Sequence, residues 1–311
     1  ESNDDLRAFQ DAVDRLVNAE MKGATLDGVR FHHSAELERR LEAAGFFGCL
    51  DVEELGRTGA ASMVMALSRL PVCAEIVASA MIAPRLCPEL PRPYAVVWEG
   101  LGSPARFLPV ARTVIAVRGA SVEAAVLGDA DEAVQGLDSL FAYPLGRLRD
   151  PSALRWQAID GADACALRDA WRVGVAAEIV GCLDAGLKAV VEYVKQRHQF
   201  GRPLGAFQAI QHRLAECATA IESARWLTLK AADTEDPLDA AVCIGFAQQA
   251  VARVSYDLHQ FMGAMGLTLE HPLHRWTYRA RLLRSDLGGA DRHFVAVARA
   301  AWEAAPRMET T

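Results

Sequence analysis

The stretch VKQRHQFGRPLGAFQAIQHRLAE (residues 194–216) places groups that bind phosphates and rings inside an interrupted helix. The guanidinium of Arg197 is a fixed fork of donors that suits a phosphate or a pyrophosphate. Gly201 and Gly205 allow the backbone to approach a ligand closely. Amide groups and an aromatic face come from three more residues, Gln199, Phe200 and Gln208. The set is typical of a dinucleotide site. The alternative is a helix break whose arginine pairs with a nearby glutamate, because surface arginines usually pair or stay solvated.

A second stretch, YDLHQFMGAMGLTLEHPLHRW (residues 256–276), carries Gln260, Gly263 and Gly266 near the end of another helix. The two glycines expose backbone on nearly one face of that helix. A helix C-terminus closed by a glycine is the alternative. Neither stretch contains GxGxxG after a strand, which argues against a Rossmann site.

The composition excludes several classes of protein. The net charge of −7 and the absence of a basic cluster argue against a nucleic-acid partner. No apolar run reaches the roughly 18 residues that a membrane span needs, and no signal segment opens the sequence. The seven cysteines form no CxxC pair and no metal-ligand spacing with histidine, and His271 and His274 lack a third ligand. We therefore expect a cytoplasmic protein with buried free thiols and no metal site.

The patterns of apolar residues predict three regions: a helical domain over 1–90, a reduced β domain over 91–165 and a helical bundle over 166–311. Val-rich segments predict strands at 112–119 and 121–128, with a third at 152–160. The strands are few, with little sign of a barrel or a sandwich. Helices of the bundle are expected near 166–196, 207–232, 238–265, 272–286 and 291–304. The fold class is thus mainly α with a small β segment.

Capping residues predict where two helices begin. Ser34 can cap a helix that Gly45 ends. Asp236 can cap a second helix, with Pro237 at its first position and Asp239 adding favourable charge in the first turn. Residues 60–84 are rich in small side chains, which let helices approach closely, so we expect them in a packed interior.

Three segments together resemble the acyl-CoA dehydrogenase family. RHQFGRPLGAFQAIQHRLAE is similar to its signature of Arg, two residues and Phe-Gly, followed by Phe-Gln and a helix that ends in Leu-Ala. HQFMGAMGLTLEHPLHRW is similar to its Gln-x-x-Gly-Gly-x-Gly segment, and LEAAGFFGCLDVEELGRTG resembles an early Gly-rich turn. The resemblance implies an N-terminal helical domain, a β domain and a C-terminal four-helix bundle.

In this family FAD lies between two subunits, and the Arg-x-x-Phe-Gly loop and the Gln-x-x-Gly segment of one subunit contact the pyrophosphate and adenosine held by its neighbour. The resemblance therefore implies that this chain provides that half of an FAD site. The implied cofactor-binding residues are Arg197, Gln199, Phe200, Leu204, Phe207, Gln208, Gln260 and Gly263. The departures from the family pattern are Gln199 and Ala264, and neither removes the charge of Arg197.

The other half of the family's site is missing from the sequence. The Thr-Glu-Pro and Gly-Ser-Asp patterns that cover the flavin are absent, and the β segment is short. Leu287 stands at the family's late catalytic Glu, and Gly289 stands where a Thr helps to hold FAD. Some members keep the base on the first bundle helix, just before an Arg. Trp171 stands at that place and Arg172 follows it, which makes Arg172 the candidate substrate residue and leaves the chain without a catalytic residue.

The family's reaction removes an α-proton beside a thioester, and this weak acid needs a positioned carboxylate. Asp286 and Asp291 flank the Leu287 position. Asp286 is the candidate for a substitute base, with a solvated or capping carboxylate as the alternative. On the first bundle helix, Glu178 and Asp184 are expected to be ordinary pairing charges. Near Gln260, His259 is expected to be a packed neutral imidazole.

The resemblance implies a subunit of a heteromeric acyl-CoA dehydrogenase that shares FAD with a homologous catalytic subunit. Shortened subunits of this kind resemble those of actinobacterial α2β2 enzymes that oxidise steroid side-chain CoA thioesters. The partner would hold the acyl-CoA and the base, and an electron-transfer flavoprotein is the family's acceptor. Three alternatives stay open: a self-sufficient homotetramer that uses Asp286, a scaffold without flavin, and a flavin monooxygenase.

Overall fold

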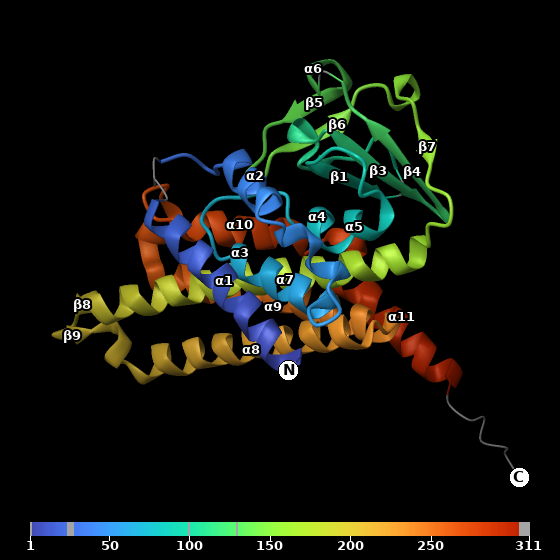
Figure 1. Cartoon of the computed structure of the whole chain (residues 1–311). Helices are drawn as coiled ribbons and strands as arrows, with labels where there is room; N and C mark the ends of the chain where they lie inside the picture. Colours follow the sequence, from blue (N-terminus) through green and yellow to red (C-terminus); the bar gives the residue numbers. More distant parts are fainter. Residues whose placement is uncertain (1, 24–27, 99, 129, 305–311) are drawn as a thin grey trace, which may run out of the picture.

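The computed structural model describes residues 2–23, 28–98, 100–128 and 130–304, with helices at both ends of the chain and β-sheets between them (Figure 1). Its α-helices are α1 (Ser2–Gly23), α2 (Ala35–Ala43), α3 (Gly56–Leu67), α4 (Val77–Met81), α5 (Ala83–Leu86), α6 (Ala130–Ala133), α7 (Ala164–Gln196), α8 (Gln208–Thr234), α9 (Pro237–Met262), α10 (Leu273–Leu283) and α11 (Gly289–Ala304). Short 3-10 helices include η4 (Leu204–Ala206), η5 (Gly263–Leu267) and η6 (Asp286–Gly288). The prediction of a mainly α fold is confirmed.

Two sheets lie on the helices at one side of the molecule (Figure 1). The larger has the order β1 (Tyr94–Trp98), β3 (Thr113–Arg118), β4 (Ser121–Val126) and β7 (Gln157–Ala158). The smaller has the order β2 (Ala105–Arg106), β6 (Leu145–Leu148) and β5 (Val134–Leu137), and β8 (His198–Gln199) and β9 (Arg202–Pro203) form a separate hairpin. Within the larger sheet β1 runs parallel to β3, and β3 pairs with β4 in antiparallel register.

The β segment is small, as predicted, but it contains more strands than the sequence indicated, and they form two sheets that pack together. Apolar residues of both sheets, among them Val97, Val114 and Leu148, form a core of their own. From the opposite face of β3, Ile115 and Val117 enter the main core with the helices. A strand buried on both faces lacks the alternation that marks a half-exposed strand. The division at residues 90 and 165 stays a prediction.

The helix α7 runs through the centre of the molecule and is buried on all sides over most of its length. Its N-cap is Asp163, whose carboxylate accepts hydrogen bonds from the backbone N–H groups of Cys165 and Ala166. The backbone of α3 crosses α7 so closely that a Cβ atom at Gly181 would lie 2.2 Å from the carbonyl oxygen of Met65. Glycine therefore allows this crossing.

The predicted helix starts and the packed interior are confirmed. The Ser34 hydroxyl accepts a hydrogen bond from the Leu37 N–H, and Asp236 accepts from the N–H groups of Leu238 and Asp239. Most side chains of residues 60–84 are buried. Arg279 of α10 donates hydrogen bonds to the carbonyl oxygens of two residues in this segment, Ser68 and Leu70, at 2.9 and 2.7 Å. These bonds hold α10 against the N-terminal helices.

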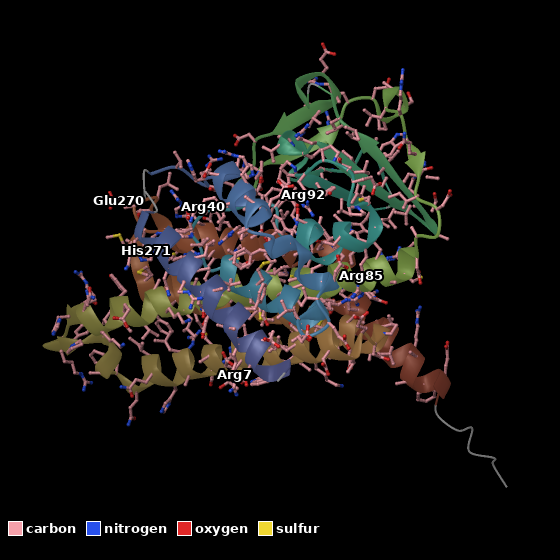
Figure 2. All side chains as sticks on the ribbon, viewed as in Figure 1. Arg7, Arg40, Arg85, Arg92, Glu270 and His271 are labelled. Carbon is pink, nitrogen blue, oxygen red and sulfur yellow. The ribbon has the colours of Figure 1, made fainter. Side chains whose placement is uncertain are left out.

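Side chains also join the helices to the sheets. Arg92, just before β1, lies between the N-terminal helices and the sheets (Figure 2). It donates a hydrogen bond of 3.2 Å to Glu42 near the end of α2. Its guanidinium lies over the rings of Phe47 and Tyr94, at 5.2 and 5.7 Å from their centres. None of the helices in the described ranges combines the length and the apolar character that crossing a membrane requires.

Glu75 is a buried carboxyl group that caps α4. It accepts hydrogen bonds from the backbone of Ala78 and from the hydroxyl of Ser79, at 2.8 and 2.6 Å. Burial raises the pKa of Glu75 to about 7, although the bond from Ser79 opposes this increase. A raised pKa in the folded state means that the protein loses stability as the pH rises through about 7.

We therefore expect the melting temperature of the wild-type chain to fall by several degrees between pH 5.5 and pH 8, because each tenfold difference in proton affinity between the folded and unfolded states changes stability by about 1.4 kcal/mol. Glu75→Gln keeps the shape and an acceptor but carries no charge, so its melting temperature should fall much less over this range. Thermal unfolding of both proteins across the pH series measures the difference. Parallel curves for the two proteins would contradict the prediction.

Candidate functional sites

The interruption between α7 and α8 is an ordered arm that projects from one end of the bundle (Figure 1). The hairpin of β8 and β9 turns at Phe200 and Gly201, whose φ angles are 54° and 79°. Two successive residues with positive φ are the geometry of a tight hairpin turn, and glycine adopts it without strain. The arm thus returns the chain directly into α8.

Several contacts hold the arm in place. The N–H of Leu204 donates to the carbonyl oxygen of Arg197 at 2.8 Å, and the Gln211 amide donates to the carbonyl oxygen of Gly205 at 2.7 Å. The guanidinium of Arg202 lies 4.0 Å from the centre of the Phe207 ring. These contacts fix the backbone from which the side chain of Arg197 extends.

The two motifs that sequence analysis singled out meet in one pocket of about 580 Å³, which we call the arm pocket. The predicted residues that line it are Arg197, Gln199, Leu204, Gln260 and Gly263. Arg197 is exposed, and within the described chain its guanidinium makes no hydrogen bond, ion pair or ring contact. The alternative in which this arginine pairs with a nearby glutamate therefore finds no support.

The remaining predicted residues do not line the arm pocket. Phe200 is 87% exposed at the tip of the hairpin and packs edge-on against Phe207, with 6.2 Å between ring centres. Gln208 is exposed at the first position of α8. Sequence analysis missed Tyr193 and Phe261, which also line the pocket. Helical spacing points to Tyr193, because it precedes Arg197 by about one turn.

A second hollow of about 470 Å³, which we call the cleft, lies between the sheets and the bundle. It brings together Trp171 and Leu287, the two residues that stand at the family's Glu positions. Aromatic and aliphatic side chains make most of its walls, and its polar groups include Ser103, Arg106, Asp138, Ser139, Ser285 and Asp286. Trp171 packs against Trp98, with ring centres 6.0 Å apart. Both tryptophans line the cleft.

Asp286 is half-buried and lines the cleft, and the backbone N–H of the next residue, Leu287, donates to its carboxylate. Its carboxylate accepts a hydrogen bond of 3.2 Å from the indole N–H of Trp171. Burial raises the pKa of Asp286, while the charge of Arg106 and the bond from Trp171 oppose this increase. The next residue, Leu287, has a φ of 53° and packs against the main core. Of the two carboxyl groups that line the cleft, Asp286 is thus the one that lies beside the two side chains that cannot accept a proton.

The prediction that Glu178 is an ordinary pairing charge is wrong. Its carboxylate is buried, pairs with Arg106 of β2 and accepts a hydrogen bond of 2.5 Å from the hydroxyl of Tyr143. The guanidinium of Arg106 also lies 4.9 Å from the centre of the Trp171 ring. Arg106 is 72 residues away from Glu178 in the sequence, so no helical spacing could reveal the pair.

Other predicted residues have structural partners. Arg172 donates to Asp169 at 2.6 Å and does not line the cleft, so its substrate role stays a prediction. Asp184 is an ordinary pairing charge, which accepts from Lys188 at 2.8 Å. The ring of His259 hydrogen-bonds the hydroxyl of Thr277 at 2.8 Å, and burial lowers its pKa, as expected for a neutral imidazole.

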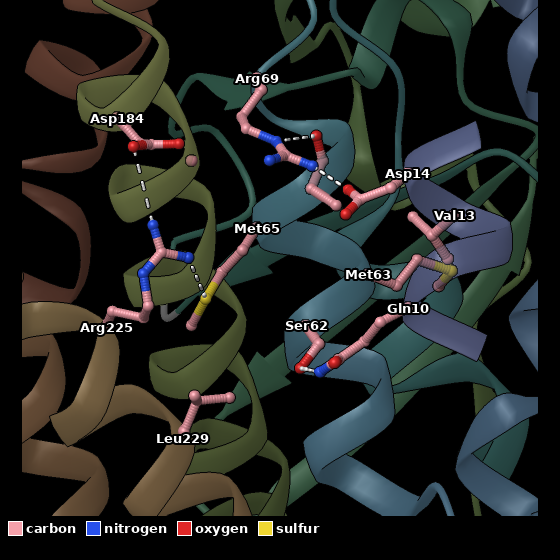
Figure 3. Close-up of a pocket in the computed structure, with 12 residues that line it drawn as sticks. Gln10, Val13, Asp14, Ser62, Met63, Met65, Arg69, Asp184, Arg225 and Leu229 are labelled. Atoms are coloured by element: carbon pink, nitrogen blue, oxygen red, sulfur yellow. Dashed lines mark hydrogen bonds and ion pairs between the residues drawn. The ribbon is translucent and has the colours of Figure 1, made fainter. Parts of the chain in front are cut away.

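The described part of the chain contains no cluster of His, Cys, Asp and Glu that could hold a metal ion. All seven cysteines are free, and six of them are buried, while Cys165 is exposed. A third hollow, of about 220 Å³, is lined by α1, α3, α7 and α8 (Figure 3). Its two arginines already have carboxylate partners, Arg69 with Asp14 and Arg225 with Asp184, so its charges are compensated.

Comparison with known proteins supports the fold and the bundle. Residues 169–301 match the family model described as "Acyl-CoA dehydrogenase, C-terminal domain". Over this segment, which spans α7 to α11, the chain is similar to the C-terminal domain of acyl-CoA dehydrogenases. The mitochondrial short-chain specific acyl-CoA dehydrogenase of Rattus norvegicus is 38% identical over 119 residues, which cover 37% of this chain and 29% of the relative. The acyl-CoA dehydrogenase IpdE2 of Mycobacterium tuberculosis is 35% identical over 114 residues, 37% of this chain and 36% of the relative. These matches span only about a third of the relatives' length.

A solved structure extends the likeness to the whole fold. The ChsE4-ChsE5 complex of Mycobacterium tuberculosis contains a chain with a TM-score of 0.75 to this one, at 24% sequence identity. The match covers 97% of this chain and 98% of that chain. The acyl-CoA dehydrogenase-like fold thus includes the N-terminal helices and both sheets as well as the bundle.

Proposed function

We propose that this chain is a subunit of a heteromeric FAD-dependent acyl-CoA dehydrogenase and supplies the pyrophosphate and adenosine side of an FAD site that its partner completes. The observation that carries the proposal is the arm pocket, where the unpaired guanidinium of Arg197 meets Gln260 and Gly263. A cationic fork beside exposed backbone fits a pyrophosphate. FAD, when bound, would accept a hydride from the substrate.

The distance between the two hollows supports a site shared between chains. Trp171 of the cleft lies on α7, and Arg197 of the arm pocket is the residue that follows the last turn of the same helix. At 1.5 Å per residue they are about 39 Å apart, which exceeds the length of an extended dinucleotide. A cofactor held by Arg197 therefore has its reactive ring on another chain.

The cleft supports a non-catalytic role for this chain. The α-proton beside a thioester needs a positioned base, and neither Trp171 nor Leu287 can accept a proton. We infer that a homologous partner supplies the base and holds the acyl-CoA. The substrate class we favour is a steroid side-chain CoA thioester, with an electron-transfer flavoprotein as acceptor, in an α2β2 assembly in the cytoplasm.

One observation favours a second candidate function. Asp286 reaches the cleft, so the chain could be a self-sufficient homotetramer with this residue as its base. Burial raises the pKa of Asp286, which favours this role. Against it, the carboxylate already accepts a hydrogen bond from Trp171, and the charge of Arg106 opposes the increase in pKa. The proposed scaffold role would leave Arg197 without a ligand.

Assembly tests the proposed function. Expressed alone, the chain should be poorly soluble or free of flavin, because it holds half of a cofactor site. Expressed with its genomic neighbours of the same family, it should form α2β2 with two FAD. Mass measurement of the intact complex and the visible absorbance of flavin provide both counts. A stable flavin-loaded homotetramer, or four FAD per tetramer, would contradict the proposal that this chain is a subunit of a heteromeric enzyme.

A further inference from the structure

The cleft has the size and the walls of a small-molecule site. Its volume of about 470 Å³ lies within the range of roughly 300–1,000 Å³ that such sites occupy. Apolar side chains come from β1, β5, α7 and α10, and the indoles of Trp98 and Trp171 provide flat faces. Such walls favour a ligand that is mostly hydrocarbon and contains a ring.

The charges of the cleft favour a neutral ligand. Arg106 is the cation among the lining residues, and it is already paired with Glu178 behind it. The lining carboxylates are Asp286, which faces the same guanidinium, and Asp138, which pairs with Arg30. Outside the lining, Arg168 lies over the ring of Trp98 at 5.7 Å. An anionic ligand would thus meet no uncompensated positive charge within the cleft.

Arg106 also provides an unused hydrogen-bonding edge. It is 8% exposed, and its Nε and Nη2 atoms have no hydrogen-bond partner in the described chain, since Nη1 alone donates to Glu178. A buried donor without a partner is costly, and a bond to an acceptor oxygen removes that cost. A carbonyl oxygen is such an acceptor and carries no net charge.

We propose that the cleft binds a neutral, largely hydrocarbon carbonyl compound, whose oxygen accepts hydrogen bonds from Arg106 and whose ring packs on Trp98 and Trp171. The proposal rests on the part of the proposed function that leaves this cleft without flavin. It assigns the cleft a ligand of its own, distinct from the acyl-CoA thioester of the partner.

Three compounds on one ring skeleton test the ligand class: α-tetralone (a ketone), tetralin (the hydrocarbon) and 1,2,3,4-tetrahydro-1-naphthoate (the carboxylate). Binding to the full chain in its assembled complex is measured by calorimetry and ligand-observed NMR. Tetralone should bind about tenfold more tightly than tetralin, because a charged donor gains an acceptor, and the carboxylate should bind most weakly. Equal affinities for ketone and hydrocarbon, or tightest binding of the carboxylate, would overturn the proposal.

Variants of this chain separate its cleft from any site in the partner. Leu137→Trp fills the cleft and should weaken tetralone binding about tenfold, whereas Leu140→Trp, at an exposed neighbour outside the lining, should leave it unchanged. Arg106→Lys keeps a cation beside Glu178 without the fork, so tetralone should bind no better than tetralin. Equal effects of Leu137→Trp and Leu140→Trp would overturn the proposal.

Two further readouts decide what else could occupy the cleft. If the complex binds butyryl-CoA and Leu137→Trp abolishes that binding, the cleft belongs to an acyl-CoA. That result would overturn the proposal of a neutral carbonyl ligand. A loss of flavin absorbance in Leu137→Trp would place flavin in this cleft and overturn the proposed function as well. Full flavin content without tetralone binding would overturn the ligand proposal alone.

Discussion

In the proposed heteromeric complex, replacing the partner's catalytic Glu with Gln is expected to lower turnover by roughly 10²–10⁴-fold, because a positioned base contributes that much and the α-proton has no other acceptor. Asp286→Asn in this chain should leave most of the turnover intact. Asparagine retains an oxygen that can accept the hydrogen bond from Trp171, so the packing of the cleft is preserved. Steady-state turnover of the two assembled variants, at equal flavin content, makes the comparison.

Two controls sharpen this result. Asp291→Asn removes the other carboxylate that flanks Leu287, in the first turn of α11, and should also leave turnover intact. Leu287→Glu should not create a second active site, because its backbone has a φ of 53° and Gly289 replaces the family's Thr. A loss of a hundredfold or more in Asp286→Asn, with FAD still bound, would make this chain catalytic.

The second large effect concerns the arm pocket. Arg197→Ala removes the proposed charge-assisted contact to the pyrophosphate, worth about 1.5–3 kcal/mol, so the affinity of the complex for FAD should fall by roughly ten- to a hundredfold. Arg197→Lys should restore the affinity only in part, because an ammonium lacks the fork. The dissociation constant of FAD, measured on the deflavinated complex, gives both values.

Lys195→Ala is the matched control for charge. Lys195 is exposed on the last turn of α7, two residues before Arg197, and pairs with Glu192 at 2.7 Å. Removing it changes the net charge equally, yet FAD affinity should stay within about twofold, since an exposed ion pair contributes little. Equal losses in Lys195→Ala and Arg197→Ala would point to a diffuse electrostatic effect, and an unchanged Arg197→Ala would place the ligand elsewhere.

The helices could be predicted from the sequence because their signals are local. The cap at Asp236 and the apolar periodicity fixed α9 within a few residues of its position. The strands of the smaller sheet, two to four residues long, depend on partners that are far away in the sequence, so their pattern carries little information. The same limit applies to the cleft, where Arg106 meets Glu178 and Asp286 through tertiary packing alone.

The candidate sites were predictable to different degrees. The resemblance identified Trp171 and Leu287 separately, and their meeting in one cleft follows from the crossing of α7 and the η6 turn. Arg197 and Gln260 were singled out by residue type, and the fold brings them into one pocket. Phe200 was predicted to contact the cofactor, yet its exposure at the tip of the hairpin depends on a turn geometry that residue types alone do not define.

The distribution of thiols makes this protein a ready subject for fluorescence spectroscopy. Cys165 is exposed at the start of α7, whereas burial raises the pKa of Cys49, Cys73 and Cys87 to about 12 and shields them from reagents. A maleimide dye should therefore label one position of the natural sequence. Since α7 is one continuous helix, the dye would lie about 48 Å from Arg197 on its own chain. Energy transfer between this dye and a flavin would then report how a second chain is oriented.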